Sequence, residues 1–318
     1  MNVKSQFSIK DLEHLSGVKA HTIRIWEKRY SLLEPQRTST NIRTYTIENL
    51  KRLLNITFLY NDGLKISKIA SLQNETIHEL VEKRAIANKE EFAIKAFKTS
   101  MFELNEGLFN KTFQDLEAHK TLSEIFLNVF MPFLMDIGSL WQTSVIRPSH
   151  ESFITELIKR KLLLYIEMES QKAKDQGNPL FILFLPYKEV HELGILFTNY
   201  EILSTGFQTI YLGVNTSLDS LKDLIETNRD IVYVSYLTMR PEGMSLIEYV
   251  DIFQTTVSNG QTSNLWLLGK KSKTTDLHKL ASNVSIINGF PELTNRLEKL
   301  KETSQKKSRA AHHKLRIL

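Results

Sequence analysis

The chain lacks cysteine, a secretion signal and any apolar run long enough to cross a membrane. Without cysteine in its 318 residues it can form neither disulfide bonds nor thiolate metal sites, which suits a reducing cytoplasm. The first fifteen residues have no apolar core of the kind that a signal peptide needs. The longest strongly apolar run, residues 179–186, has the length of a strand, whereas a bilayer span needs about 20 residues. We therefore expect a cytoplasmic protein that does not enter membranes.

Composition and charge are those of a multidomain globular protein with basic ends. A hydrophobic fraction of 42% and a charged fraction of 24% are ordinary, and 318 residues suggest two or three domains. Residues 1–75 contain 12 Lys and Arg against 7 Asp and Glu, and residues 299–318 contain 7 against 1. Residues 76–298 carry 22 against 28. Binding of a polyanion is therefore expected to involve the ends of the chain.

The first 30 residues predict two short helices joined by a tight turn. Ser8 and Asp11 can form a capping box for a helix that ends at Gly17. A second helix is expected over residues 19–30, and its spacing gives it two faces. The inward face carries Ile23, Trp26 and Tyr30, and the outward face carries His21, Arg24, Ile25 and Lys28. A short helix, a glycine turn and a second helix with basic outward residues match the helix-turn-helix pattern.

A small hairpin and a third helix are expected next. Two short β-prone pieces, residues 34–37 and 42–45, flank a polar tip and predict a wing. Alternation puts Arg43 and Tyr45 on one face, where a guanidinium and a phenol can contact phosphate. Thr46 then caps a helix that Gly63 ends, and residues 64–72 supply a short fourth helix.

Residues 7–72, about a fifth of the chain, resemble the MerR family of DNA-binding regulators. The resemblance rests on Gly17-Val18, Thr22-Ile23-Arg24, Trp26 to Tyr30, Pro35-Gln36-Arg37 and Arg43-Thr44-Tyr45. Two positions depart from the family pattern, since Ser31 and Asn41 stand where glycine is usual. Asn tolerates positive φ better than other non-glycine residues, so the wing should survive.

The resemblance implies a function in transcription for this part of the chain. It implies that the recognition helix enters the major groove while the wing grips the flanking backbone. The DNA-binding residues expected on this basis are Lys19, His21, Thr22, Arg24, Ile25, Lys28, Arg37, Arg43 and Tyr45. The expected partners are palindromic double-stranded promoter DNA and a second copy of the chain, as a homodimer or higher homo-oligomer. RNA polymerase is a further candidate partner.

Residues 76–175 are predicted to be helical throughout. Residues 76–100 contain neither glycine nor proline and read as a helical linker, the position where MerR proteins pair as a coiled coil. Residues 101–175 predict a bundle of about four helices with a dense apolar face. That face carries Phe126, Val129, Phe130, Phe133, Leu134 and Ile137.

From residue 176 to 303 the pattern changes to strands that alternate with helices. Five short β-rich runs lie at residues 179–186, 207–213, 230–236, 264–269 and 283–287. Helices are expected between them, at about 192–204, 217–227, 243–258 and 274–282, and after them at 292–303. Buried strands with helical crossovers predict a doubly wound parallel sheet of flavodoxin-like type. Such sheets bind ligands beyond the carboxyl ends of their strands.

Two common functions of this architecture do not fit the strand ends. A phosphoacceptor receiver domain needs Asp after the third strand, where this chain has Ser235. A nucleotide-binding Rossmann unit needs a glycine-rich first loop, and residues 189–194 contain a single glycine.

The strand ends instead resemble those of cobalamin-binding domains. The matching residues are Glu189, His191 and Gly194 after the first strand, then Ser235 and Leu237, then Gly269. The resemblance implies that His191 ligates the cobalt of adenosylcobalamin or methylcobalamin. An acidic neighbour would fix the tautomer of that imidazole. Small residues at the third and fourth strands would admit the nucleotide tail. The family's Asp is Glu189 here, and its second glycine is Lys270, whose stem narrows the tail tunnel.

The helical bundle strengthens this resemblance. In light-responsive MerR-type repressors that bind adenosylcobalamin, a similar bundle covers the upper face of the corrin with a Trp and a Glu. Trp141 and Glu151 match those positions. The His residues that follow them in those repressors are Gln142 and Ser152 here, which puts their photochemical bis-His ligation in doubt, and His150 is a candidate substitute.

We therefore interpret the chain as a multidomain regulator: winged helix-turn-helix, helical bundle, then cobalamin-type α/β domain. A basic tail follows at residues 304–318. The alternative is a ligand-free DNA-binding scaffold whose degenerate α/β domain serves assembly. A cobalamin-dependent methyl-transfer subunit conflicts with the DNA-binding module. Nucleophile–base pairs and metal-hydrolase clusters are missing from the pattern, so we expect no enzyme activity.

Overall fold

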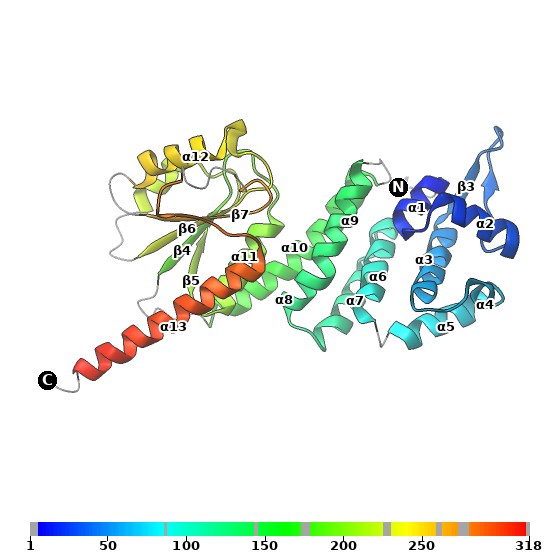
Figure 1. Cartoon of the computed structure of the whole chain (residues 1–318), viewed down its shortest axis with the longest axis horizontal. Coiled ribbons are helices and arrows are strands. Elements are labelled where there is room, and N and C mark those ends of the chain that lie inside the picture. Colours follow the sequence, from blue (N-terminus) through cyan, green and yellow to red (C-terminus); the bar gives the residue numbers. More distant parts are fainter. Residues whose placement is uncertain are drawn as a thin grey trace. The chain divides into compact units, whose positions relative to one another are not determined.

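The computed structural model of the protein describes residues 6–85, 88–142, 146–172, 179–224, 230–258, 263–272 and 280–315 (Figure 1). It divides into two compact units, residues 1–158 and 159–318. Among the helices in those ranges, none combines the length and the apolar character that a membrane span requires.

The first unit begins with a winged helix-turn-helix. Helix α1 (Ile9–Ser16) and helix α2 (Ala20–Tyr30) precede the wing, which is built from β2 (Gln36–Arg37) and β3 (Arg43–Thr46). A short strand that the sequence pattern did not predict, β1 (Gln6–Phe7), completes an antiparallel sheet of order β1-β3-β2. Helices α3 (Ile47–Asn61) and α4 (Ile66–Ala70) follow, so the predicted order of elements is confirmed.

The local signals for these boundaries are confirmed in detail. The Ser8 hydroxyl accepts from the Asp11 backbone N–H while the Asp11 carboxylate accepts from the Ser8 N–H, which is the predicted capping box. Gly17 is left-handed at φ 74°. The two departures from glycine are left-handed as well, Ser31 at φ 51° and Asn41 at φ 64°, and the wing forms in spite of them.

Five helical segments complete the first unit and lead into the second. They are α5 (Asn74–Ala85), α6 (Lys89–Glu103), α7 (Glu106–Glu117), α8 (Leu122–Ile125) with α9 (Met131–Gln142), and α10 (Pro148–Ser170). A π-helical turn, Phe126–Phe130, joins α8 to α9. Residue 100, where the linker was expected to end, lies inside α6. Because the buried Phe97 ring of α6 lies 4.9 Å from Phe109 and 5.3 Å from Phe130, α6 is part of the bundle.

The second unit contains the predicted parallel sheet. Its strands are β4 (Leu180–Phe184), β5 (Gln208–Tyr211), β6 (Ile231–Tyr236), β7 (Asn264–Leu268) and β8 (Val284–Ile286), in the order β5-β4-β6-β7-β8. All four neighbouring pairs are parallel. This confirms the doubly wound fold, in which the strand order reverses beside β4.

Helices cover both faces of this sheet (Figure 1). Helix α12 (Leu246–Phe253) lies on one face with the 3₁₀ segment Leu218–Leu224 and the π segment Gln254–Ser258. Helices α11 (Leu193–Ser204) and α13 (Phe290–Leu315) lie on the other. The helix expected at 274–282 falls mainly on residues outside the described ranges, and residues 280–282 are not helical. The backbone of the expected tail continues α13 to Leu315.

Candidate functional site

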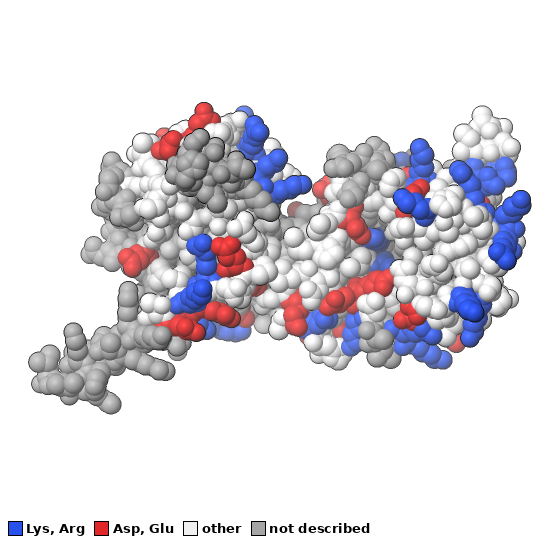
Figure 2. Space-filling view, in the orientation of Figure 1, with Lys and Arg blue, Asp and Glu red and all other residues white. Residues whose placement is uncertain are grey.

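The outward face of α2 presents the expected DNA-reading residues to solvent. Arg24 and Lys28 are exposed, and Ile25 keeps 53% of its surface in spite of its apolar side chain. His21 is also exposed, and Thr22 is half-buried beside it. Lys and Arg side chains gather over α2 and the base of the wing (Figure 2). A basic, exposed second helix of this kind can enter a DNA groove.

The inward face of α2 is core, as the sequence predicted. Ile23 is fully buried and Trp26 nearly so, and the Trp26 ring meets Tyr60 of α3 edge-on at 5.3 Å. Lys19 stands at the start of α2, where its ammonium group pairs with Glu13 at 3.2 Å. The expected contacts of Lys19 with DNA would therefore compete with an ion pair.

The two arginines of the wing interact with different partners. Arg37 donates to Asn41 at the wing tip over 2.6 Å, which explains how a non-glycine tip is stabilised. The Arg43 guanidinium, half-buried, lies 3.3 Å from the Glu27 carboxylate of α2. Both side chains remain available for phosphate contacts only in competition with these partners.

Tyr45 differs from the expectation that its phenol meets the DNA backbone. The side chain is completely buried, and its hydroxyl donates to the Glu27 carboxylate over 2.5 Å. Burial and the Glu27 carboxylate both raise the pKa of the Tyr45 phenol. Alternation put Arg43 and Tyr45 on one face, and both do contact Glu27. The sequence pattern could not show that this face packs against α2. Because the Tyr45 side chain is buried and bonded to Glu27, the geometry argues against direct contact between Tyr45 and DNA. Glu27, which the sequence analysis gave no role, joins the wing to the recognition helix.

At the carboxyl edge of the parallel sheet, a buried carboxylate is held by two loops. Glu189, 3% exposed, follows β4. Its Oε1 accepts the backbone N–H groups of Val190 and His191 at 3.0 Å, and its Oε2 accepts those of Thr238 at 3.0 Å and Met239 at 2.8 Å. Burial raises the pKa of the Glu189 carboxyl, but the donors from His191 and Met239 outweigh burial, so the pKa lies below its usual value.

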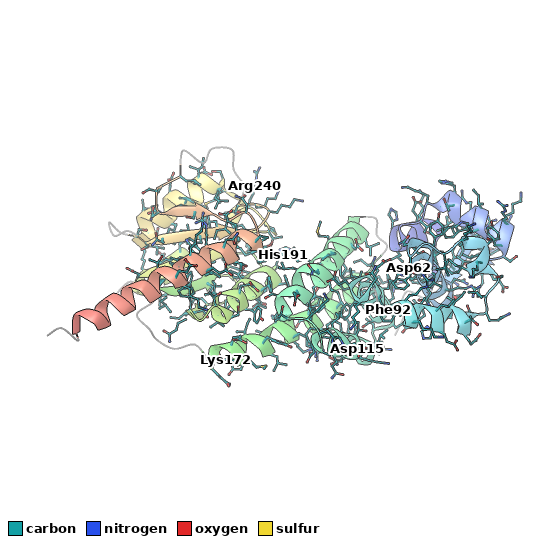
Figure 3. All side chains as sticks on the ribbon, turned by 60° about the horizontal axis from the view of Figure 1, so that its bottom comes forward. Asp62, Phe92, Asp115, Lys172, His191 and Arg240 are labelled. Carbon is teal, nitrogen blue, oxygen red and sulfur yellow. The ribbon has the colours of Figure 1, made fainter. Side chains whose placement is uncertain are left out.

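The same carboxylate orients an exposed imidazole. Nδ1 of His191 lies 2.6 Å from Oε1 of Glu189, while the His191 side chain keeps 52% of its surface exposed. With Nδ1 donating to the carboxylate, the other ring nitrogen, Nε2, carries the lone pair and can act as a ligand. His191 and Arg240 mark the same end of this unit in Figure 3.

Three exposed apolar residues lie in the loops at this edge of the sheet. Tyr187, Val190 and Met239 belong to the two loops that hold Glu189, and all three are large hydrophobic residues with exposed side chains. Exposed apolar side chains in the same loops as a potential ligand nitrogen are more favourable for binding an apolar ligand than for contact with water. Groups of three or more potential metal ligands do not occur among the described residues, so His191 acts alone in this respect.

The small residues of the expected tail tunnel are present but closely covered. A Cβ atom at Gly194 would lie 2.5 Å from the ring of Tyr236, which therefore fills the space beside this glycine. At Gly269, with φ 96°, a Cβ atom would lie 2.5 Å from the backbone oxygen of Leu237. Ser235 is completely buried, and its hydroxyl has no hydrogen-bond partner among the described residues. Leu237 is buried as well.

Lys270 was expected to narrow the tail tunnel, and that expectation is wrong. Its side chain is exposed, so its stem has found room at the surface. The residue that does fill space is Tyr236, the middle residue of the Ser235-x-Leu237 motif. An aromatic side chain at that middle position was the available signal, and the sequence analysis did not use it.

The expected covering residues of the bundle can be tested only in part. The side chain of Trp141, at the end of α9, and that of Gln142 lie outside the described residues. Glu151 is half-buried in the first turn of α10. His150 is 1% exposed, its ring packs on Phe102 at 5.3 Å, and its Nδ1 accepts the Arg147 N–H at 3.3 Å. This buried position corrects the suggestion that His150 substitutes as an upper ligand.

These observations fit the binding of a corrin ring and its cobalt better than the binding of a nucleotide tail. The oriented His191 would be able to hold the cobalt of a corrinoid, and the Ser235 hydroxyl, which has no partner among the described residues, would be able to bond a polar group of a bound molecule. The Tyr236 ring leaves no room for a nucleotide tail beside Gly194 in the conformation described.

Comparisons with known proteins agree with the DNA-binding module and with the helical bundle that follows it. Residues 7–76 match the profile of the MerR HTH family of regulatory proteins, and residues 93–164 match that of the B12 binding domain. The HTH-type transcriptional repressor CarH of Myxococcus xanthus is 23% identical over 242 residues, which are 74% of this chain and 80% of CarH. The repressor CarA of the same organism is 22% identical over 236 residues, 73% of this chain and 77% of CarA. Both relatives are repressors rather than enzymes, in line with the expectation of a regulator.

A solved structure supports the fold. The monomethylamine corrinoid protein of Methanosarcina barkeri superimposes with a TM-score of 0.54 and 12% identity, covering 66% of this chain and 99% of that protein. At this identity the likeness establishes the architecture of the helical bundle and the parallel sheet.

Proposed function

We propose that this chain, a MerR-type regulator that carries a B12-binding domain, controls transcription in response to a corrinoid bound at His191. In this proposal two copies bind a palindromic promoter through α2 and the wing. Adenosylcobalamin and methylcobalamin are the first ligands to test. The observation that carries the proposal is the pair formed by buried Glu189 and exposed His191, 2.6 Å apart at the ligand-binding edge of the sheet.

The chain's own residues perform three tasks in this proposal. Glu189, fixed by four backbone N–H groups, holds Nδ1 of His191 and so directs Nε2 outward. The exposed apolar side chains of the same loops, Tyr187, Val190 and Met239, would be covered by the ligand and would lose their contact with water. When bound, a corrinoid supplies a cobalt ion that accepts the imidazole nitrogen as its lower ligand. Ser235 offers a hydroxyl for which the protein provides no other partner among the described residues.

Regulation requires that the ligand distinguish two states of the protein. A ligand shifts such an equilibrium only by the difference between its affinities for the two states. We propose that the states differ in assembly, because a dimer engages both half-sites of a palindrome and a monomer engages one.

The test is a direct binding experiment on the full chain. The protein is mixed with each cobalamin in the dark and desalted, and its absorption spectrum is recorded before and after illumination. We expect the natural chain to retain corrin absorbance after desalting, and we expect the absorption spectrum of His191→Ala to differ from it. DNA affinity, measured on an operator selected from random duplexes, should differ between the free and the loaded protein. A colourless protein with unchanged DNA binding would contradict sensing of these two cobalamins, and corrinoid sensing as a whole fails if a corrinoid without a nucleotide tail is not retained either.

One observation favours a second candidate, the ligand-free DNA-binding scaffold. Because Tyr236 fills the space beside Gly194, the α/β unit is well packed there without any ligand. In that case the unit would serve assembly, and the colourless outcome above would be found together with normal dimers.

A further inference from the structure

The ring of Tyr236 is fixed on several sides at the carboxyl edge of the sheet. It stacks on Phe290 of α13 with ring centroids 6.0 Å apart and an angle of 18° between the planes. Phe290 in turn meets Phe197 of α11 edge-on at 4.7 Å. The Tyr236 ring also lies against Gly194 in the first turn of α11. Moving this ring would therefore break an aromatic cluster that joins both helices to the sheet.

The position of the Tyr236 ring decides whether the nucleotide tail of a cobalamin can enter the protein. That tail leaves from the lower face of the corrin ring, which is the face that a lower histidine ligand approaches. If His191 held the cobalt of a cobalamin, the benzimidazole base of that ligand would have to lie beside His191 within the protein or remain outside it. Gly194 lies three residues after His191, in the first turn of α11, and it has no side chain, so we take it as the entrance for such a base.

That entrance is closed in this chain. A single Cβ atom at Gly194 would come within 2.7 Å of three carbons of the Tyr236 ring. A space too small for a methyl group cannot hold a benzimidazole, whose two faces each need about 3.5 Å to the neighbouring carbons. At the adjacent strand, the approach over Gly269 is limited by the backbone of Leu237, which cannot swing aside as a side chain can.

We infer that Tyr236 is a specificity-determining residue, which makes the His191 site select corrinoids that have no nucleotide tail over cobalamins. This inference rests on the proposed function, since it concerns the ligand of the same site. The class of ligand is a cobinamide, which keeps the corrin ring and cobalt of cobalamin but lacks the nucleotide. The His191 nitrogen is then the sole candidate for the lower position, because the ligand brings no base of its own.

The test compares two ligands on one preparation of full-length protein. Hydroxocobalamin and aquohydroxocobinamide are titrated separately, and each affinity is measured from the change in corrin absorbance. Because both ligands meet the same protein sample, their affinity ratio does not depend on the fraction that is folded. For the natural chain the ratio should favour the cobinamide by about tenfold or more, a difference of about 1.4 kcal/mol.

Two variants separate the ring from its hydroxyl. Tyr236→Phe keeps the ring and should retain the preference for the cobinamide. Tyr236→Ala opens the space beside Gly194 and should shift the ratio toward cobalamin by about tenfold or more. The inference would be overturned if the ratio of the two affinities were the same in Tyr236→Ala as in the natural chain. It would also be overturned if the natural chain bound cobalamin as tightly as the cobinamide.

The proposed function can fail separately from this inference. If the natural chain binds neither corrinoid and Tyr236→Ala binds cobalamin, Tyr236 is confirmed as the block, and corrinoid sensing is removed from the natural protein. If all three proteins bind neither corrinoid, both the proposed function and the inference are overturned.

Discussion

The ammonium group of Lys95, on α6, donates to the backbone oxygen of Leu54, on α3, over 2.7 Å. It also lies 4.1 Å above the ring of Phe58 on the same helix. One half-buried cation thus joins the helical bundle to the DNA-binding domain within the first unit. Burial lowers the pKa of Lys95 to about 7, while nearby Glu91 opposes this and nearby Lys98 adds to it.

Lys95→Met should stabilise the contact between α3 and α6 at neutral and mildly acidic pH. The unfolded chain binds the Lys95 proton up to a pKa near 10.4, whereas the folded chain releases it near 7. The cost of burying the charge is therefore complete below pH 7 and declines as pH rises toward 10. We expect a gain of about 2 kcal/mol at pH 6, after discounting for solvent near the amine.

Hydrogen exchange of amides in α3 and α6 measures this local stability. The natural chain should gain protection between pH 7 and 9.5 relative to Lys95→Met, with intrinsic exchange rates corrected for pH. Equal pH dependence in the two proteins would show that Lys95 stays charged throughout.

Tyr45→Phe should lower the stability of the wing without removing a contact with DNA. The change removes a hydrogen bond to the Glu27 carboxylate and leaves that carboxylate with one fewer donor, at a cost of about 1.5–3 kcal/mol. Thermal unfolding measures the loss. If the phenol instead contacts phosphate, DNA affinity would fall in Tyr45→Phe while stability remained unchanged.

Arg24→Ala and Arg43→Ala should weaken DNA binding in different ways. Arg24 is exposed on α2, so its loss should cost about 1–3 kcal/mol and relax preference at one base position. Arg43 lies on the wing, so its loss should weaken all duplexes and reduce the salt dependence by about one phosphate contact. Lys111→Ala, an exposed cation on α7, is the control. Equal behaviour of Arg24→Ala and Lys111→Ala would remove Arg24 from the interface.

Glu189→Gln should destabilise the carboxyl edge of the sheet even without a ligand. An amide has one accepting oxygen, and its NH₂ group would face backbone N–H donors that now point at a carboxylate. Two of these donors come from the β6 loop, so we expect a loss of about 2–3 kcal/mol, measured by chemical denaturation. Asp251→Asn, at an exposed carboxylate on α12 of the same unit, controls for a general effect of lost charge. A stable Glu189→Gln would mean that the loops do not depend on the carboxylate.

Gly269→Ala and Gly138→Ala should have opposite effects. At Gly269 the backbone is left-handed and a Cβ atom would meet the Leu237 oxygen at 2.5 Å, so we expect a loss of at least about 2 kcal/mol. At Gly138, within α9, a Cβ atom meets open space, so alanine should stabilise by about 0.5–1 kcal/mol. The free energies of unfolding of the two variants and of the natural chain, measured under the same conditions, test the predicted signs. A neutral Gly269→Ala would show that the Leu237 backbone yields.

Elements whose signals lie within a few residues could be predicted from the sequence. Residues 180–184 and 265–268 are continuous apolar runs within strands β4 and β7, and the cap at Ser8 is a local pattern, so each formed as expected. The Glu189–His191 pair is local too, because two residues of one loop make the contact.

Features that depend on the approach of distant segments could not be predicted. The depth of Tyr45 is set by Glu27, eighteen residues earlier, and alternation defines a face but not what covers it. The direction of the Tyr236 ring is set by Gly194 and Phe290, which are distant along the chain. Burial of His150 likewise depends on Phe102 of another helix.

The way in which Glu189 is held has a consequence for how such sites change during evolution. All four donors outside the imidazole are main-chain N–H groups, which any residue except proline supplies. Substitutions at residues 190, 238 and 239 can therefore accumulate without loosening the carboxylate. The recognisable signature shrinks to an acid and a histidine two residues apart, so distant members of this kind are better recognised by backbone geometry than by residue identity.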